Sequence, residues 1–351
     1  MITIFTPSFA DEANTNAQNL TAKEIVSRLP ADRFRVVLLG KGAPDPRILA
    51  RENTEILPWS RHGNTARWLT RVLLSNIDVY FFPREGPLDT TFLFFRRTLG
   101  LPIALVTYIV MALDEIPVGP TMTRSIREAD CVIGNSRYVA QTVQDRFGVA
   151  TGTIYDGVKR DVFYPPIEGR RNESRLTVFY AGSFQKRKRV NVVIHEATKW
   201  PAVEFRLAGK GEEEAACRSL VNQLKCRNVT FVGHLSQPGL AEEMRMADVF
   251  LFPSVLEGHP QVLGQAASCG LPAVAMAKYR PDYVVHGETG YLVESESELS
   301  QKLGWLLADQ ELRLRMSAAA ARHALQFDWN KVARDWEKVF VEATDKRRKK
   351  L

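Results

Sequence analysis

The sequence contains little cysteine. Its four cysteines, at positions 131, 217, 226 and 269, include no Cys-x-x-Cys pair. This scarcity excludes a disulfide-stabilised scaffold and argues against a structural zinc site. Scattered single cysteines are typical of proteins in a reducing compartment, so we expect a cytoplasmic location.

Long hydrophobic runs are also absent. The longest apolar stretch, Thr98 to Leu113, falls short of the roughly 18 residues that a membrane helix needs, and Gly100 and Pro102 interrupt it. We interpret this stretch as a helix end, a loop and a buried strand. The opening residues, MITIFTPSFADE, lack a charged start and soon turn polar, so we expect no signal peptide.

Positive charge is concentrated in two places. The chain has 47 Lys and Arg against 40 Asp and Glu, a formal net charge of +7. Two runs, Lys186–Arg189 and Lys346–Lys350, account for this excess, and the rest of the chain is slightly acidic. A general nucleic-acid binder tends to be basic over a whole face, so we expect no nucleic-acid partner.

What the sequence does have is an alternation of short apolar runs and helical patterns, in both halves of the chain. With 351 residues, 45% of them hydrophobic, the chain is long enough for two globular domains. Runs that are apolar on both faces suit strands of a parallel sheet covered by helices. The pattern predicts two doubly wound α/β domains, and the cleft between them is the default ligand site.

Residues 167–174, with proline just before them, a glycine, charges and no periodicity, are typical of a linker. We therefore expect one domain in residues 1–166 and another in residues 175–327. An amphipathic helix at 328–343 and a basic tail at 344–351 complete the chain.

The first motif with chemical content is Tyr180-Ala-Gly-Ser-Phe-Gln-Lys-Arg-Lys-Arg-Val190. A strand ends near Gly182 and Ser183, a run of cations follows, and a helix begins. Arg187 offers a planar fork and Lys188 a compact charge for phosphate oxygens, beside a helix N-terminus. The alternative is a solvated loop, or a basic run that resembles a nuclear-localisation signal. The position at a strand end favours phosphate binding.

The next strand end, Phe205-Arg-Leu-Ala-Gly-Lys-Gly211, repeats this arrangement and places Lys210 after the strand. A lone Gly-x-Gly is a weak signal, and a tight strand-to-helix turn is the alternative. The motif matters because it is the following strand-end turn in the same half of the chain.

The third motif, from Ala247 to Ala275, reads ADVFLFPSVLEGHPQVLGQAASCGLPAVA. A helix is predicted to begin near Gln261 and to stop at Gly270. The N–H groups of His259, Gln261 and Val262 lie at its start. Such a helix start carries about half a positive charge and binds phosphate.

Glu257, followed by Gly258, precedes this helix. A carboxylate at that place either caps the helix, which is the structural alternative, or accepts hydrogen bonds from ligand hydroxyls. A later turn, within Pro281–Val293, is expected to be structural.

Taken in order, these segments resemble a known family. AGSFQKRK, FRLAGKGE, NVTFVGHLS, ADVFLFPSVLEGHP, CGLPAVAM and HGETGYLV resemble the C-terminal half of the retaining glycosyltransferases of family 4, which have the GT-B fold. ADCVIGNSRYVAQTV and YDGVKRDVFYPP are similar to the segments before that family's linker. The resemblance covers about Ala129 to Phe340. It implies two Rossmann-like domains: an acceptor-side domain joined by the last helix, and a nucleotide-sugar-binding domain at 175–327.

The resemblance also implies roles for single residues. Two family cations after the first strand of the nucleotide domain hold the donor diphosphate, and they match Arg187 and Lys188. Where the family more often has arginine directly after the glycine, this chain has Ser183. The implied catalytic residues are Arg187, Lys188 and Glu257, and the implied donor-binding residues are Gly182, Ser183, Lys210, Leu235, Gly258, His259, Gln261, Val262 and Gln265.

Two further positions depart from the family. Its paired glutamates, eight positions apart, lie near the donor sugar and at the ribose; here they match Glu257 and Gln265. An amide contacts a diol without charge assistance, which predicts a weaker ribose contact. A histidine that many members place after a strand of the first domain corresponds to Tyr108. The turn at Leu235 resembles the family's base-contacting turn.

The implied reaction is transfer of a sugar from a nucleotide diphosphate sugar to an acceptor hydroxyl, with retention. The chain has no Asp-x-Asp, and its six histidines lack metal-ligand spacing, so we expect neither a metal nor a cofactor. Gln265, Ser183 and Tyr108 motivate an alternative, a non-catalytic nucleotide-binding member. A nucleotide-sugar epimerase of the same fold is a third candidate.

The basic tail has two interpretations that the sequence leaves open. It either contacts anionic lipid at the inner membrane surface or is a frayed, solvated end. Lipid contact would fit an acceptor such as a glycolipid or a cell-surface glycan.

Overall fold

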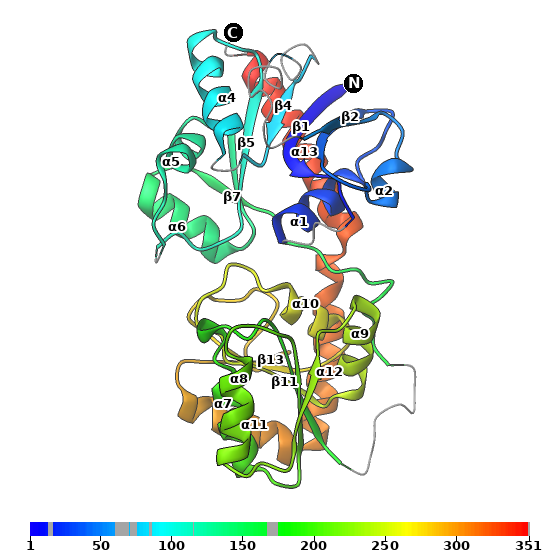
Figure 1. Ribbon diagram of the computed structural model, residues 1–351, viewed down its shortest axis with the longest axis vertical. Helices are drawn as coiled ribbons and strands as arrows, with labels where there is room; N and C mark the ends of the chain where they lie inside the picture. The colour runs from blue at the N-terminus through cyan, green and yellow to red at the C-terminus, as the bar shows by residue number, and fades with distance from the viewer. Residues whose placement is uncertain are drawn as a thin grey trace. The chain divides into compact units, whose positions relative to one another are not determined.

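The computed structural model describes residues 1–12, 17–59, 70, 76–83, 86–114, 116–166 and 175–349. They form two compact units, Met1–Asp156 with Trp329–Leu351 (unit 1) and Gly157–Asp328 (unit 2) (Figure 1). The predicted linker, 167–174, lies outside the described residues.

Unit 1 is built on a parallel sheet. Its described strands pair in the order β3-β2-β1-β4-β5-β6-β7. They are β1 (Ile2–Phe9), β2 (Phe34–Gly40), β3 (Thr54–Pro58), β4 (Val79–Phe81), β5 (Ala104–Ile109), β6 (Cys131–Gly134) and β7 (Thr151–Thr153). The described helices of unit 1 are α1 (Ala17–Val26), α2 (Pro46–Leu49), α4 (Pro87–Thr98), α5 (Pro120–Arg127), α6 (Arg137–Phe147) and α13 (Trp329–Arg348). The stretch from Thr98 to Leu113 is a helix end, a loop and the buried strand β5, which confirms our interpretation of it.

The last helix of the chain, α13, belongs to the core of unit 1. Its aromatic side chains Trp336 and Phe340 are fully buried among residues of the sheet. The ring of Trp336 lies 4.9 Å from that of Phe81 and 4.8 Å from that of Tyr108. Because aromatic residues recur on one face of this helix, it can bury that face against β4, β5 and α1 (Figure 1).

Residues 344–348 of the predicted tail are part of this helix. Lys346 donates to the carbonyl oxygen of Asp130 over 2.9 Å, and Arg347 to that of Leu101 over 2.7 Å. Arg348 forms an ion pair with Asp78 at 2.9 Å. The cations at this end of the helix are therefore held by unit 1, because the last turn of a helix favours positive charge and the nearby carbonyls accept from it.

Unit 2 repeats the same plan. Its described strands pair in parallel in the order β10-β9-β8-β11-β12-β13. They are β8 (Thr177–Ala181), β9 (Glu204–Ala208), β10 (Val229–Gly233), β11 (Val249–Phe252), β12 (Ala273–Met276) and β13 (Gly290–Val293). The helices are α7 (Val190–Lys199), α8 (Glu214–Gln223), α9 (Gln237–Met246), α10 (Gln261–Ser268), α11 (Glu296–Ala308) and α12 (Gln310–His323), with short 3₁₀ turns at Lys186–Lys188 and Ala324–Phe327.

An aspartate marks the same junction in both sheets. Asp78, just before β4, accepts the backbone N–H of Thr3 in β1 over 2.9 Å, and Asp248, just before β11, accepts that of Thr177 in β8 over 2.8 Å. Each aspartate ties the first strand of its sheet to the fourth, where the strand order reverses direction. A ligand of a doubly wound sheet binds at the carboxyl ends of the strands beside this point.

Among the described residues, no helix combines the length and the apolar character that crossing a bilayer demands.

Candidate functional site

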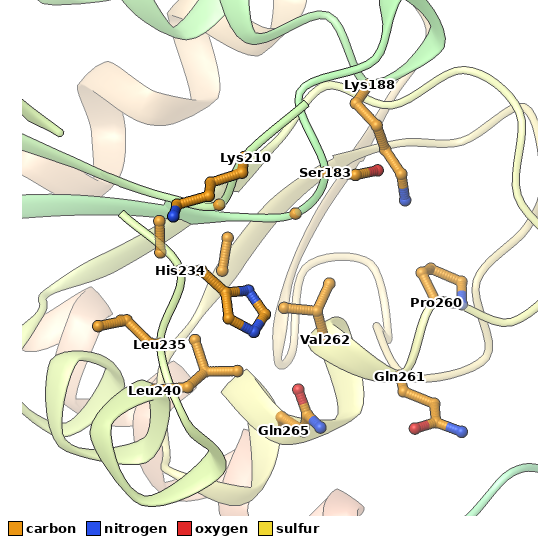
Figure 2. A pocket seen from close by; sticks show the side chains of 14 residues that line it. Ser183, Lys188, Lys210, His234, Leu235, Leu240, Pro260, Gln261, Val262 and Gln265 are labelled. Carbon is orange, nitrogen blue, oxygen red and sulfur yellow. The ribbon is translucent and has the colours of Figure 1, made fainter. Parts of the chain in front are cut away.

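A pocket of about 400 Å³ opens at the carboxyl ends of the unit 2 strands (Figure 2). Its walls come from the loops after β8, β9 and β10 and from the first turns of α9 and α10. The residues that line it are Ala181, Gly182, Ser183, Lys188, Ala208, Gly209, Lys210, His234, Leu235, Leu240, Pro260, Gln261, Val262 and Gln265. The pocket thus lies at the switch point of this sheet, where a ligand is expected.

Glycines allow the strand-end loops to approach each other closely. A Cβ on Gly209, whose φ is +136°, would lie 1.9 Å from the carbonyl oxygen of Gly182. A Cβ on Gly182 would lie 2.8 Å from the hydroxyl oxygen of Tyr180. Hydrogen bonds from Gly182 N–H to Ala208 O (3.1 Å) and from Gly209 N–H to Gly233 O (2.7 Å) join the three loops. The backbone of this wall is therefore fixed by glycine at two places.

The residues of the cationic run after β8 lie in different environments. Lys186–Lys188 form a 3₁₀ turn, and Arg189, at φ +54°, ends it and begins α7. Lys188 is 9% exposed and lines the pocket. Arg187 is not among the lining residues; its guanidinium donates to the carbonyl oxygen of Leu256 over 2.7 Å. Arg187 and Lys188, which the sequence assigned to the same role, are thus adjacent in the chain, but only Lys188 lines the pocket.

Glu257 forms ion pairs with both Lys188 and Arg187. Its Oε1 lies 2.5 Å from Nζ of Lys188 and 3.2 Å from a guanidinium nitrogen of Arg187. The hydroxyl of Ser254 donates to the same oxygen over 2.5 Å. Burial lowers the pKa of Lys188, and the charge of Glu257 acts against that shift. Glu257 itself is 8% exposed and is therefore a buried carboxylate, and the N-cap residue of α10 is Pro260 rather than Glu257.

The start of α10 faces the Lys188 side of the pocket. Pro260 is its N-cap, and Gln261, Val262 and Gln265 contribute side chains to the pocket (Figure 2). The first N–H groups of a helix have no partner within it. Leu263 N–H already donates to the carbonyl oxygen of Pro260 over 2.9 Å, so the N–H groups of Gln261 and Val262 are the ones at the helix start for an anion. The helix ends at Cys269, and Gly270 follows at φ +66°, which confirms the predicted glycine stop.

His259 occupies a different environment from these residues. Its ring is 4% exposed and stacks on Tyr283, with ring centroids 3.7 Å apart. Burial holds the pKa of His259 well below its ordinary value, so the ring is neutral. Neither His259 nor Gly258 lines the pocket, and the ring of His259 packs against Tyr283 instead.

The opposite end of the pocket contains residues that sequence reasoning partly missed. Leu235 and Lys210 were predicted from the sequence, and both line the pocket (Figure 2). His234 and Leu240, which line it beside them, were not predicted. His234 stands beside Leu235 in the segment NVTFVGHLS, so its position after β10 was a usable signal. Leu240 gave none, because its place depends on how α9 packs beside the loop.

Tyr108, which the resemblance matched to a histidine of the family, is buried in unit 1. Its hydroxyl donates to Asp156 over 3.0 Å, and the same carboxyl accepts from Asn135 (3.0 Å) and Thr21 (3.2 Å). Burial raises the pKa of Asp156 to about 6, although all three donors lower it. With 1% of its surface exposed, Tyr108 supports this carboxyl and is not presented to solvent.

Across the described ranges, no group of three or more His, Cys, Asp or Glu side chains is arranged to hold a metal ion.

Comparisons with known proteins agree with this geometry. Residues 166–323 match the family model described as "Glycosyl transferases group 1". A D-inositol 3-phosphate glycosyltransferase of Mycobacterium tuberculosis is 33% identical over 258 residues, which cover 65% of this chain and 52% of that protein. An uncharacterized glycosyltransferase of Methanocaldococcus jannaschii is 25% identical over 220 residues, 62% of this chain and 61% of the relative. The matches thus span between half and two thirds of these relatives.

Solved structures show the same fold over nearly the whole chain. The Anabaena protein HepE, in complex with UDP and glucose, has a TM-score of 0.77 at 17% identity and covers 97% of this chain and 99% of its own. Sucrose-phosphate synthase of Thermosynechococcus elongatus has a TM-score of 0.78 at 18% identity, with coverages of 97% and 99%. The predicted GT-B architecture of two Rossmann-like domains is confirmed.

Proposed function

We propose that this chain, whose residues 166–323 match the group 1 family of glycosyl transferases, is an enzyme of that family. It transfers a sugar from a nucleotide diphosphate sugar to an acceptor hydroxyl, with retention. The observation that carries the proposal is the unit 2 pocket, in which Lys188, Lys210 and the first turn of α10 surround one space at the switch point of the sheet. A diphosphate fits these charges, and HepE, which shares the fold, was solved with UDP and glucose bound.

Different residues of the pocket contact different parts of the donor. Lys188 and the start of α10 face the diphosphate, and Arg187 adds its charge from beside Glu257. Gln265, with one amide, contacts the ribose, and the loop of His234 and Leu235 contacts the base. Glu257 accepts hydrogen bonds from the sugar hydroxyls once its cations turn to the phosphates.

In the transfer step, the bond between the sugar C1 and the diphosphate oxygen breaks and the nucleoside diphosphate leaves with the electron pair. The acceptor oxygen bonds to C1 from the same face, and its proton passes to the departing phosphate oxygen. No protein base is needed in this scheme. The main task of the chain is to stabilise the charge that develops on the diphosphate, which Lys188 and Arg187 perform.

The acceptor is a glycan or glycolipid hydroxyl that unit 1 receives. We place the reaction in the cytoplasm, with contact at the inner membrane surface, because a lipid-linked or cell-surface glycan precursor would be met there. Donor transfer needs neither a resident cofactor nor a metal in this proposal.

A thermal-shift screen of UDP, GDP, ADP and their sugars tests the donor site. A nucleotide at 100 times its Kd should raise the free energy of unfolding by about 2.7 kcal/mol. Lack of stabilisation by every nucleotide would contradict the donor site. Stabilisation without turnover of any nucleotide sugar, over a panel of acceptors, would instead indicate a non-catalytic nucleotide-binding protein.

Turnover in the presence of EDTA tests metal independence. We expect an unchanged rate of nucleotide release, because protein cations carry the leaving-group charge. A rate that falls with EDTA and returns with Mg²⁺ or Mn²⁺ contradicts this part of the proposal.

A further inference from the structure

The edge of unit 1 at the amino ends of its strands gathers arginines from three helices. Arg96 and Arg97 come from the end of α4, Arg124 and Arg127 from α5, and Arg347 from the end of α13. We call these five residues the basic edge. The C-terminal end of α13 lies beside α4, where Arg347 donates to the carbonyl oxygen of Leu101 (Figure 1). Only folding brings these helices together, since they are far apart in the sequence.

Two adjoining hollows follow the basic edge. One, of about 360 Å³, is lined by Arg96, Arg97 and Arg347 together with Gly100 and Glu128. The other, of about 420 Å³, is lined by Arg124, Arg127 and Glu128 among others. Glu128 is common to both, so the arginines face one continuous, indented surface.

Little negative charge compensates these arginines. Arg97 and Arg124 share a single carboxylate, Glu128, at 3.9 and 3.8 Å. Arg127, which is exposed, forms no ion pair or hydrogen bond with any side chain in the described ranges. Like charges placed together cost free energy unless an anion covers them, so this surface favours an anionic partner.

The buried member of the group, Arg96, is paired within the protein but lies close to another cation. Arg96 forms an ion pair with Asp130 and donates to the carbonyl oxygen of Ile103 over 2.9 Å. Burial lowers the pKa of Arg96, Asp130 raises it, and the nearby charge of Arg347 lowers it further. The guanidinium of Arg347 is thus close enough to repel that of Arg96.

Exposed apolar side chains lie beside these cations. Phe94, on α4, is 54% exposed, and Leu99, just after that helix, is 61% exposed. Phe94 precedes Arg97 by one helical turn, and Leu99 adjoins Gly100 at the rim of the first hollow. Single exposed apolar residues need no explanation, but apolar and cationic side chains together are typical of a surface that meets a lipid headgroup layer.

We propose that the basic edge docks on the surface of an anionic lipid bilayer. The exposed guanidinium groups of Arg97, Arg124 and Arg127 contact headgroup phosphates. Phe94 and Leu99 enter the boundary between headgroups and acyl chains. A nucleic acid would supply phosphates but would leave these two side chains in water, so the composition of the surface favours lipid. Docking there leaves the carboxyl ends of the unit 1 strands uncovered, because they lie at the opposite edge of the sheet.

Co-sedimentation of the full chain with vesicles tests the proposal. We expect binding to vesicles that contain phosphatidylglycerol, weakening as salt is raised, and little binding to phosphatidylcholine alone. The double variant R97A/R127A should bind about thirtyfold more weakly, from about 1 kcal/mol per cation. The variant F94S/L99S should bind roughly tenfold more weakly, because it removes apolar area that docking would bury.

A matched control comes from unit 2. L314S/R315A changes an exposed leucine and an adjacent exposed arginine on α12, and it should bind the vesicles as the unchanged chain does. Melting temperatures establish that each variant is folded. Stabilisation of R97A/R127A by UDP, compared with the unchanged chain, separates failure of this proposal from failure of the proposed donor site.

Three results would overturn the proposal. One is vesicle binding that R97A/R127A leaves unchanged, and another is equal binding to neutral vesicles. The third is binding of a DNA duplex as tight as that of anionic vesicles and insensitive to F94S/L99S, which would make nucleic acid the partner of this surface.

Discussion

Nζ of Lys188 lies 2.5 Å from Oε1 of Glu257. The lysine that faces the donor pocket is therefore already neutralised by a carboxylate of the same site. A nucleoside diphosphate that binds there has to take this cation, and that of Arg187, from Glu257. We propose that donor binding exchanges one anion for another and releases Glu257 toward the sugar.

Glu257→Gln tests this exchange. We expect the variant to bind free nucleoside diphosphate more tightly, by roughly tenfold, because Lys188 no longer has a competing carboxylate. Transfer should nevertheless fall, since the sugar loses a charged acceptor for its hydroxyls. Calorimetric titration with UDP, beside steady-state turnover, separates these effects; weaker UDP binding would contradict the exchange.

Lys188→Ala should lower kcat by about 10²–10³, by analogy with the loss of one donor to a developing oxyanion. Lys186→Ala is the matched control, because Lys186 is exposed on the same 3₁₀ turn and does not line the pocket. Nucleotide release by the purified variants measures both. Near-normal turnover by the Lys188 variant would remove this lysine from the mechanism.

Gly209→Ala should disrupt the wall between the loops after β8 and β9. Its Cβ would meet the carbonyl oxygen of Gly182 at 1.9 Å, and its φ of +136° is unfavourable for any side chain. We expect destabilisation by about 1–3 kcal/mol and loss of UDP-dependent stabilisation. Gly239→Ala is the control, since its Cβ would meet only ordinary contacts, the nearest at 3.5 Å. Equal melting temperatures for the two variants would show that the loops can separate freely.

The buried carboxyl of Asp156 should make stability depend on pH. Its folded-state pKa is raised from 3.8 to about 6, so folding favours the protonated form. The stabilisation is complete below the unfolded-state pKa and is lost as pH rises from about 4 to about 6, a change of about 3 kcal/mol at most. Urea unfolding across this range measures the slope.

Asp156→Asn should remove this part of the slope, because an amide does not ionise and can still accept from Tyr108 and Thr21. Asp161→Asn, at an exposed carboxylate of unit 2, is the comparison and should keep the slope. If the Asp156 variant keeps the slope as well, another group is responsible for it.

Most of the fold could be predicted from the sequence alone, because each strand-to-helix junction has a recognisable local sequence pattern. A run of buried residues, then glycine or a cation, then a helical pattern occurs at Gly182 and again at Gly209, and parallel strands necessarily bring such junctions to one edge. The approach of the C-terminal ends of α4 and α5 to that of α13 has no comparable local signal. The tail at 344–348 was ambiguous for that reason, since its charges are consistent with solvent, lipid or a docked helix end.

For the site, the sequence by itself placed Ser183, Lys188 and Lys210 after strand ends, and the family resemblance added Gln265 in the helix that follows. The structure places all four around one pocket. Only the tertiary structure decided what each side chain contacts there. In the folded chain, Arg187 contacts Leu256 and Glu257, and His259 stacks on Tyr283. Five arginines from three helices lie at one edge of unit 1. Local sequence sets backbone conformation, but the neighbours of a long charged side chain come from segments distant in the chain, and their geometry exists only after folding.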